Sequence, residues 1–263
     1  MAWWLRNAVQ KAANALGYQI VSSNRAVSFG SMDPIIATEF GHIYDKCKQY
    51  TMTSVERMYA LHKAVEHIVD YGIVGDLVEC GVWKGGSLMV MAYTLLEKGD
   101  TSRKIYAYDT FEGMTEPSAE DFHLDAKDYR LDNMALIKDW RLGQRKDHNE
   151  SAYASLQEVT RNVLSTGYPP EKFVFVPGRV EDTIPKVLPK AIALLRLDTD
   201  WYESTKHELN YLFPLLSRNG FLIVDDYGYW AGSKKAVDEY FRINHIQMFL
   251  NRIDYKGRMG IRT

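Results

Sequence analysis

The chain has 263 residues, of which 46% are hydrophobic and 25% are charged, as in globular proteins that form one large α/β domain or two small ones. A net charge of −2 argues against a nucleic-acid partner. No apolar run reaches the roughly 18 residues of a membrane span, and the first residues do not show the long apolar region and cleavage site expected of a signal peptide. Cys47 and Cys80 form neither a metal-binding motif nor a disulfide framework, so we expect a cytoplasmic protein.

Residues 2–16 predict a short amphipathic helix that carries Trp3 and Trp4 with Arg6 and Lys11. A basic helix with tryptophans is typical of one that lies on a membrane surface. Two basic residues attract anionic lipid weakly, so we favour an arm that docks on the domain or on a second subunit of a homo-oligomer. We therefore divide the chain into a helical arm and connector, 1–52, and a main domain, 53–263.

A helix is predicted from Thr53, where Thr53–Glu56 reads as a capping box. A short strand, 76–79, then leads through a glycine-rich turn into a helix over 88–96. Gly81 lets a ligand approach the backbone, and the helix start offers free N–H groups. The turn is not G-x-G-x-x-G, and Glu79 ends the strand. Both features oppose a dinucleotide and favour a cofactor with a positively charged amine and sulfonium.

The second strand, 104–108, ends at Asp109. A carboxylate there can bind ribose hydroxyls, although it can also cap the turn that follows. Residues 115–150 are rich in charge and lack a lasting period, which predicts an irregular insertion acting as an active-site lid. The same charges would also suit a plain solvated surface.

Strands and helices alternate along the rest of the chain. Further strands are predicted at 172–176, 192–197 and 220–224, further helices at 151–165, 203–216 and 233–241 (with Ser233 as N-cap), and a hairpin at 248–262. The loop containing Gly178 follows the third strand, where a purine would fit. The order predicts an α/β fold with a mostly parallel sheet and an antiparallel C-terminal edge.

Two pairs of acids follow neighbouring strands. Asp198 and Asp200 come after strand 192–197, and Asp225 and Asp226 after strand 220–224. The carboxyl ends of parallel strands meet at one edge of a sheet, where ligands bind. Clustered carboxylates repel one another unless a cation lies between them, and oxygen ligands suit Mg²⁺. A helix cap would explain one acid but not both pairs.

Four motifs in this order resemble the macrocin O-methyltransferase family: Leu77–Ser87, Tyr108–Gly113, Leu197–Tyr202 and Leu222–Gly228. The resemblance runs from about Thr53 to the C-terminus. It implies a Rossmann-like class I methyltransferase fold with seven strands and helices on both faces of the sheet. It also implies methyl transfer from S-adenosylmethionine, with Mg²⁺, to a sugar hydroxyl of a small-molecule glycoside or glycan.

By resemblance, Asp198, Asp225 and Asp226 would bind the metal, and Asp200 would be the general base. The cofactor-binding set would be Thr53, Ser54, Glu79, Gly81, Ser87, Asp109, Gly178 and Asp198. The alternatives are a catechol-type methyltransferase, which the aromatic residues around Trp201 and Trp230 keep open, and a non-catalytic scaffold. A nicotinamide dehydrogenase is opposed by the missing glycine motif.

Overall fold

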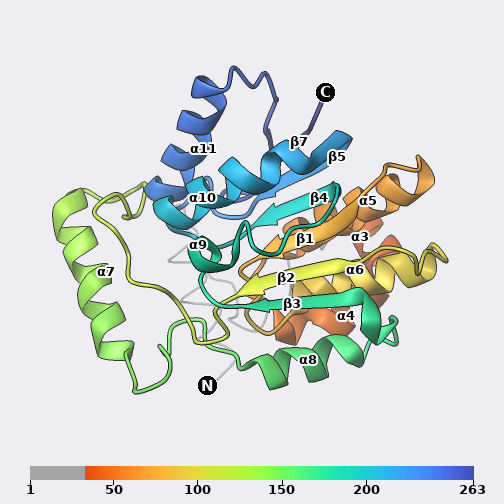
Figure 1. Ribbon diagram of the computed structural model, residues 1–263, viewed down its shortest axis with the longest axis horizontal. Helices are drawn as coiled ribbons and strands as arrows, with labels where there is room; N and C mark the ends of the chain where they lie inside the picture. The colour runs from red at the N-terminus through yellow and green to blue at the C-terminus, as the bar shows by residue number, and fades with distance from the viewer. Residues whose placement is uncertain (1–32) are drawn as a thin grey trace, which may run out of the picture. The chain divides into compact units, whose positions relative to one another are not determined.

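The computed structural model describes residues 33–263 (Figure 1). The predicted helix at 2–16 lies outside the described residues. Residues His42–Thr263 form one compact unit. In the described part of the chain, no helix is both long enough and apolar enough to cross a membrane.

A seven-stranded sheet of order β3-β2-β1-β4-β5-β7-β6 runs through this unit (Figure 1). Strands β1 to β5 are parallel, and β7 is antiparallel to both β5 and β6. This confirms the predicted mostly parallel sheet with an antiparallel C-terminal hairpin. The strands are β1 (Asp76–Cys80), β2 (Ile105–Asp109), β3 (Phe173–Pro177), β4 (Ile192–Leu197), β5 (Leu216–Val224), β6 (Asn251–Arg252) and β7 (Arg258–Ile261).

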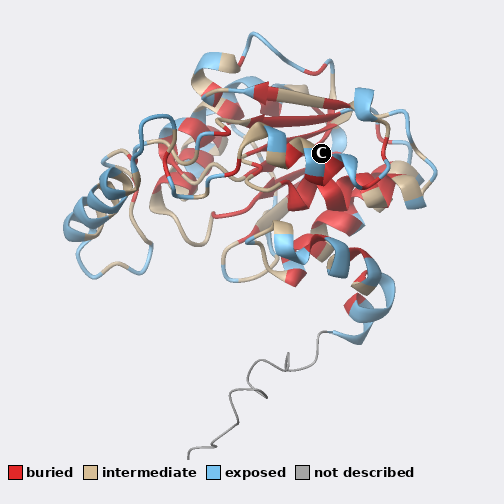
Figure 2. Cartoon of the chain, turned by 90° about the horizontal axis from the view of Figure 1, so that it is seen from below, coloured by how far each residue is buried: buried red, intermediate tan, exposed pale blue. Residues whose placement is uncertain are grey.

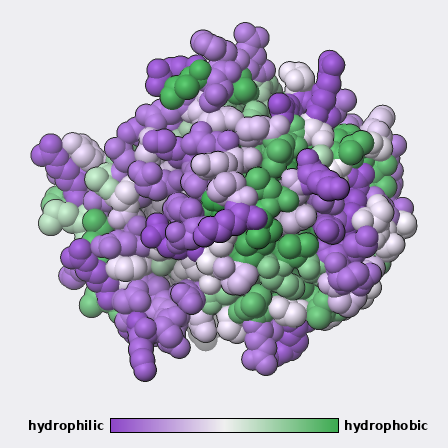
Figure 3. Space-filling model, in the orientation of Figure 1, coloured by the Kyte–Doolittle hydropathy of each residue, from purple (hydrophilic) through white to green (hydrophobic). Residues whose placement is uncertain are grey.

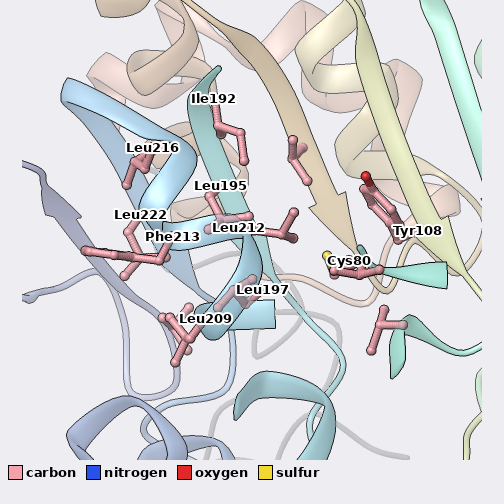
Figure 4. Packing of buried hydrophobic residues seen from close by; sticks show 14 of the residues in the cluster. Cys80, Tyr108, Ile192, Leu195, Leu197, Leu209, Leu212, Phe213, Leu216 and Leu222 are labelled. Carbon is pink, nitrogen blue, oxygen red and sulfur yellow. The ribbon is translucent and has the colours of Figure 1, made fainter. Parts of the chain in front are cut away.

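Helices cover both faces of the sheet, which is why β4 is buried along its whole length. On one face, Leu195 and Leu197 of β4 pack with Leu209 and Phe213 (Figure 4). Arg196, between them in sequence, points to the opposite face. The helices are α3 (Pro34–Glu39), α4 (Gly41–Cys47), α5 (Val55–Asp70), α6 (Gly86–Glu97), α7 (Tyr129–Gly143), α8 (Leu156–Leu164), α9 (Val180–Thr183), α10 (Tyr202–Leu212) and α11 (Ala231–Ile243).

Several predicted helix starts were wrong. The cap of α5 is Ser54, whose hydroxyl accepts the Arg57 N–H, so Thr53 lies outside the helix. Helix α8 starts only after Ser155, which caps it by accepting the Glu158 N–H. Helix α11 starts at Ala231, so Ser233 lies buried inside it and is not a cap. At α5 and α8 the local sequence offered more than one hydroxyl, and packing selects among them, whereas α11 starts after Trp230 without a side-chain cap.

The insertion contains a helix that the sequence did not predict. Helix α7 spans Tyr129–Gly143 and begins at Asp128, whose carboxylate accepts the N–H groups of Arg130 and Leu131. None of its residues is buried, as Figure 2 shows. Because α7 packs no apolar face against the core, its sequence shows no clear helical period of apolar residues. The sequence of this segment therefore looked like that of a loop. Figure 3 shows hydrophilic side chains predominating on the α7 side of the molecule and hydrophobic ones gathering near strands β1 to β3.

Candidate active site

A pocket of about 250 Å³ opens at the carboxyl ends of β1, β2, β4 and β5. This is the edge at which ligands bind in parallel α/β sheets. Most of the acids singled out in the sequence line it, along with the glycine-rich turn. These residues are Glu79, Gly81, Ser87, Asp109, Asp198, Asp200, Asp225 and Asp226.

The glycine-rich turn is required by the backbone around it. Gly81 has φ +80°, and a side chain there would strike the carbonyl group of Asp198 at the end of β4. Gly85, at φ +87°, precedes the first turn of α6. The turn thus brings the ends of β1 and β4 close together beside the pocket. We had expected Gly81 to make room for a ligand, but the group that lies close to it is the Asp198 carbonyl of the same chain.

Glu79 is a buried acid with one unused oxygen. Its Oε1 pairs with Arg196, while its Oε2 has no hydrogen-bond partner among residues 33–263. Burial raises the pKa of Glu79 to about 7, against the opposing effect of Arg196. Glu79 lines the pocket, and its Oε2 is a buried acceptor without a partner. A positively charged amine of a ligand could supply the missing donor.

Asp109 organises two turns around the pocket. Its Oδ2 accepts the N–H of Val82 at 2.7 Å, and its Oδ1 accepts the N–H of Phe111 at 2.7 Å. The carboxylate therefore acts as a turn cap, while it also lines the main pocket. It borders a smaller adjoining pocket of about 60 Å³ as well, which includes Gly178 and Arg179. The two pockets form a continuous path from Glu79 toward Gly178 along the strand ends.

Three carboxylates meet at the other side of the main pocket. Asp198, Asp200 and Asp226 each place an oxygen within 4.8 Å of the others. Burial, with repulsion from neighbouring acids, raises the pKa values of Asp198 and Asp226 well above their ordinary range. Burial likewise raises the pKa of Asp200 to about 7. Carboxylates this close together repel one another and therefore bind protons tightly. A hard divalent cation, which prefers oxygen ligands, could take the place of those protons.

Asp225 is placed differently from the other three acids. Its Oδ1 pairs with Arg196 and its Oδ2 with Arg57. Arg196 also donates to Asp198 Oδ2 at 2.7 Å, and Arg57 Nε lies 3.0 Å from Asp254 Oδ2. Both guanidinium groups are nearly inaccessible to solvent. The structure thus gathers three of the four acids into one cluster and joins the fourth to a buried ion-pair network.

Sequence reasoning missed this network, and with it Arg57, Arg196 and Asp254. One signal was present: Arg196 stands in an otherwise apolar buried strand, and a buried charge needs partners. Thr53 lines the pocket, and its hydroxyl accepts from Arg196 Nη2 at 3.0 Å. Ser54 is not among the lining residues; its hydroxyl donates to Asp254 Oδ2 at 2.8 Å.

The insertion is fastened to the rim of the site. Asp121 is fully buried, and its Oδ1 accepts the N–H of Tyr202 at the start of α10. Its Oδ2 accepts the N–H and the hydroxyl of Ser118. The His123 ring lies 4.3 Å from the ring of Trp230, which lines the pocket with Tyr229. The rim of the pocket is therefore aromatic, and the insertion holds it in place.

The sheet order and the strand-end pocket define a Rossmann-like class I methyltransferase fold. The solved structure of the O-methyltransferase NovP has a TM-score of 0.68 and 34% identity, over 81% of this chain and 82% of that chain. The calicheamicin methyltransferase CalS11, at 18% identity and a TM-score of 0.57, shares the fold over 88% of this chain and 87% of that chain. The model of the macrocin O-methyltransferase (TylF) family matches residues 42–259, and the chain belongs to this family of O-methyltransferases.

Two relatives have names that describe their reactions. The chain is 36% identical to the 8-demethyl-8-(2,3-dimethoxy-α-L-rhamnosyl)-tetracenomycin-C 4'-O-methyltransferase of Streptomyces olivaceus, over 81% of this chain and 69% of that protein. It is 34% identical to the demethyldecarbamoylnovobiocin O-methyltransferase of Streptomyces niveus, over 81% of this chain and 76% of that protein.

Proposed function

We propose that this protein transfers a methyl group from S-adenosylmethionine to a sugar hydroxyl of a glycosylated natural product or glycan, with Mg²⁺ in the site. The family supports O-methylation, and the rhamnosyl group in the name of the S. olivaceus relative supports a sugar. The observation that carries the proposal is the cluster of Asp198, Asp200 and Asp226 in the pocket that also contains the unpaired oxygen of Glu79.

S-adenosylmethionine would lie along the two adjoining pockets. Its ammonium group would meet Glu79 Oε2, which supplies a buried acceptor for a positive charge. Asp109 would lie beside the ribose hydroxyls at the end of β2, where its oxygens already accept from Val82, Trp83, Phe111 and Thr110 and could exchange the longer of these bonds for the ribose. Gly178 would border the purine. Thr53, Gly81, Ser87 and Asp198 would complete the lining, whereas the position of Ser54 argues against direct contact.

Asp198, Asp225 and Asp226 are the proposed metal ligands. Asp225 Oδ1 accepts from Arg196 and keeps a second lone pair for a cation, whereas Oδ2 accepts from both Arg57 and the Thr53 hydroxyl. When bound, Mg²⁺ would lower the pKa of a coordinated sugar hydroxyl and fix its oxygen in place. Arg57 and Arg196 would hold the Asp225 carboxylate in place through their ion pairs, so that this ligand is positioned before the metal binds.

Asp200 is the proposed general base. Among the described residues no guanidinium contacts it, whereas Asp225 is held by two. Its pKa of about 7 suits proton transfer near neutrality. Its carboxylate would take the proton from the hydroxyl as the oxygen attacks the methyl carbon and the bond from carbon to sulfur breaks.

A phenol is the second candidate acceptor. The aromatic residues of the pocket, Tyr50, Trp83, Tyr229 and Trp230, favour it, because a flat ring would stack on them. A phenol gives up its proton more easily than a sugar hydroxyl and depends less on a base. The Asp200→Asn variant should therefore lose activity on a glycoside by a larger factor than on a catechol.

Calorimetric titration of S-adenosylmethionine and of Mg²⁺ tests the proposal directly. We expect both to bind, with Mg²⁺ binding lost in Asp226→Asn and S-adenosylmethionine binding lost in Glu79→Ala. A methyl-transfer screen of rhamnosides against catechols then identifies the acceptor. Binding of S-adenosylmethionine with no response to Mg²⁺ would remove the metal from the mechanism, and binding of neither would favour a non-catalytic protein.

A further inference from the structure

Asp200 occupies a strained turn. It has φ +66°, a conformation that residues other than glycine rarely adopt. The Trp201 N–H donates to the Thr199 carbonyl at 2.7 Å, which closes a three-residue turn centred on Asp200. Turns of this hand are rare and strained, and they persist only where the surrounding structure holds them.

A buried acid on helix α10 holds the start of this turn. The Thr199 hydroxyl donates to Glu208 Oε1 at 2.9 Å, and Glu208 is 0% exposed. Within the described part of the chain, its Oε2 makes no hydrogen bond of normal geometry, although the carboxyl group also faces the thiol of Cys80, which is a weak donor. Burying a carboxyl group with so few strong partners costs free energy, so stability alone is a poor reason for an acid at this position. A role in shaping the turn gives a better one.

The flanks of the turn are fixed by other segments. Before it, the Asp198 N–H donates to the Cys80 carbonyl at 2.9 Å. After it, Trp201 Nε1 donates to the Thr115 carbonyl at 3.0 Å. These bonds fix where the chain enters and leaves the turn. The hydrogen bond to Glu208 holds the side chain of Thr199, which immediately precedes the strained residue Asp200.

We propose that Glu208 is a positioning residue that holds the strained turn through Thr199 and so keeps the Asp200 carboxylate beside Asp198 and Asp226. The inference rests on the proposed function, in which this cluster holds Mg²⁺ and Asp200 is the base. Without the Glu208 bond the turn relaxes and the Asp200 carboxylate leaves the cluster. The negative charge that attracts the cation then falls.

Three variants separate positioning from general packing. Glu208→Met removes the acceptor at similar length, and Thr199→Val removes the donor at similar size. Glu208→Gln is the matched control, because its amide oxygen still accepts from Thr199. Burial raises the pKa of Glu208 well above its ordinary value, which favours the uncharged carboxyl group, and the uncharged amide of similar size is therefore a close replacement.

The first measurement is the Mg²⁺ dissociation constant from calorimetry. Glu208→Met and Thr199→Val should each weaken binding about fivefold to tenfold, whereas Glu208→Gln should stay within about twofold of wild type. In an Asp200→Asn background, Glu208→Met should add less than about a twofold loss, because the charge that it positions is gone. An unchanged affinity in Glu208→Met would overturn the inference, as would an equal loss in both backgrounds.

The second measurement is hydrogen exchange at the Trp201 amide, which needs no metal. Exchange should be faster in Glu208→Met and Thr199→Val and unchanged in Glu208→Gln. If the wild-type protein binds no Mg²⁺, the proposed function fails, and this exchange pattern still tests whether Glu208 holds the turn. Equal exchange in all variants would overturn the inference even where Mg²⁺ binding agrees with the proposed function.

Discussion

The four acids at the strand ends show how surroundings divide the roles of a single residue type. Asp225 lies between two buried guanidinium groups, which balance its charge. Asp198, Asp200 and Asp226 lie close together, and burial, with repulsion from neighbouring acids, raises their pKa values. A carboxylate whose charge is balanced suits a structural or ligand role, and one whose pKa lies near neutrality suits proton transfer.

This division predicts opposite effects on stability. In metal-free protein, Asp225→Asn should lower the free energy of unfolding by about 1–3 kcal/mol, because Arg57 and Arg196 each lose one buried acidic partner, while Arg57 keeps Asp254 and Arg196 keeps Glu79 and Asp198. Asp226→Asn should leave that free energy unchanged or raise it, because it removes a repelling charge. Urea denaturation in the presence of a chelator measures both. Equal losses in the two variants would contradict the assignment of Asp225 to the ion-pair network.

The raised pKa values predict that protons compete with Mg²⁺. The metal binds ionised carboxylates, so its affinity should fall as the pH drops from 8 through the Asp200 pKa of about 7. Binding at neutral pH should release protons. Calorimetry in two buffers of different ionisation enthalpy measures that release, and Asp200→Asn should reduce it. An affinity that does not change between pH 8 and pH 6 would show that the cluster is already ionised.

Helix α7 and its flanking loops show how an element can be ordered without joining the core. No residue of α7 is buried, and the insertion is joined to the rest of the domain through buried Asp121 and through backbone bonds of Phe122 and Leu124. Asp121 accepts from Tyr202 at the start of α10, and a side chain at Gly232 would strike its carboxylate. The position of the insertion beside the aromatic rim therefore depends on a few polar bonds.

Asp121→Ala should release the insertion. It leaves buried donors of Tyr202 and Ser118 unpaired, so we expect a loss of about 1–3 kcal/mol in stability. Proteolysis within residues 115–150 should become faster, and the KM for the acceptor should rise more than kcat falls. Asp125→Ala, at an exposed position of the same insertion, is the matched control and should behave as wild type.

The strands were predictable from the sequence and the insertion was not. Strand β4 matched its predicted bounds, because a buried strand shows as a continuous apolar run between loops. Helix α7 shows no such run, and only the cap at Asp128 indicated it. The four acids of the site were visible because they follow strands. Their partners were not, because Arg57 and Asp225 lie 168 positions apart and only the folded sheet brings them together.

At the scale of the whole molecule, the candidate site lies within one compact unit. The residues that line the main pocket fall between Tyr50 and Lys256. The membrane-facing and docking interpretations of residues 2–16 both stay predictions, as do the homo-oligomer and the cytoplasmic location. Neither interpretation of the N-terminal helix requires it for ligand binding.

A variant lacking residues 1–16 should therefore bind S-adenosylmethionine and Mg²⁺ within about twofold of the full chain. Because we favour a docking arm, the two proteins should also sediment equally with liposomes of anionic lipid. Sedimentation of the full chain alone would assign the arm to a membrane surface and would favour a lipid-linked glycan as the acceptor.

The turn between β6 and β7 has a consequence for how the enzyme is made. Asp254 in that turn accepts from Ser54 and Arg57, residues 200 and 197 positions earlier. Arg57 in turn holds Asp225. During synthesis on the ribosome, the arginine network lacks this acid until the turn between β6 and β7 has been made. A chain that stopped before Asp254 would keep the pairs of Arg196 with Glu79 and Asp225, but Ser54 and Arg57 would lose this acceptor, so the start of α5 would be held less firmly beside the pocket.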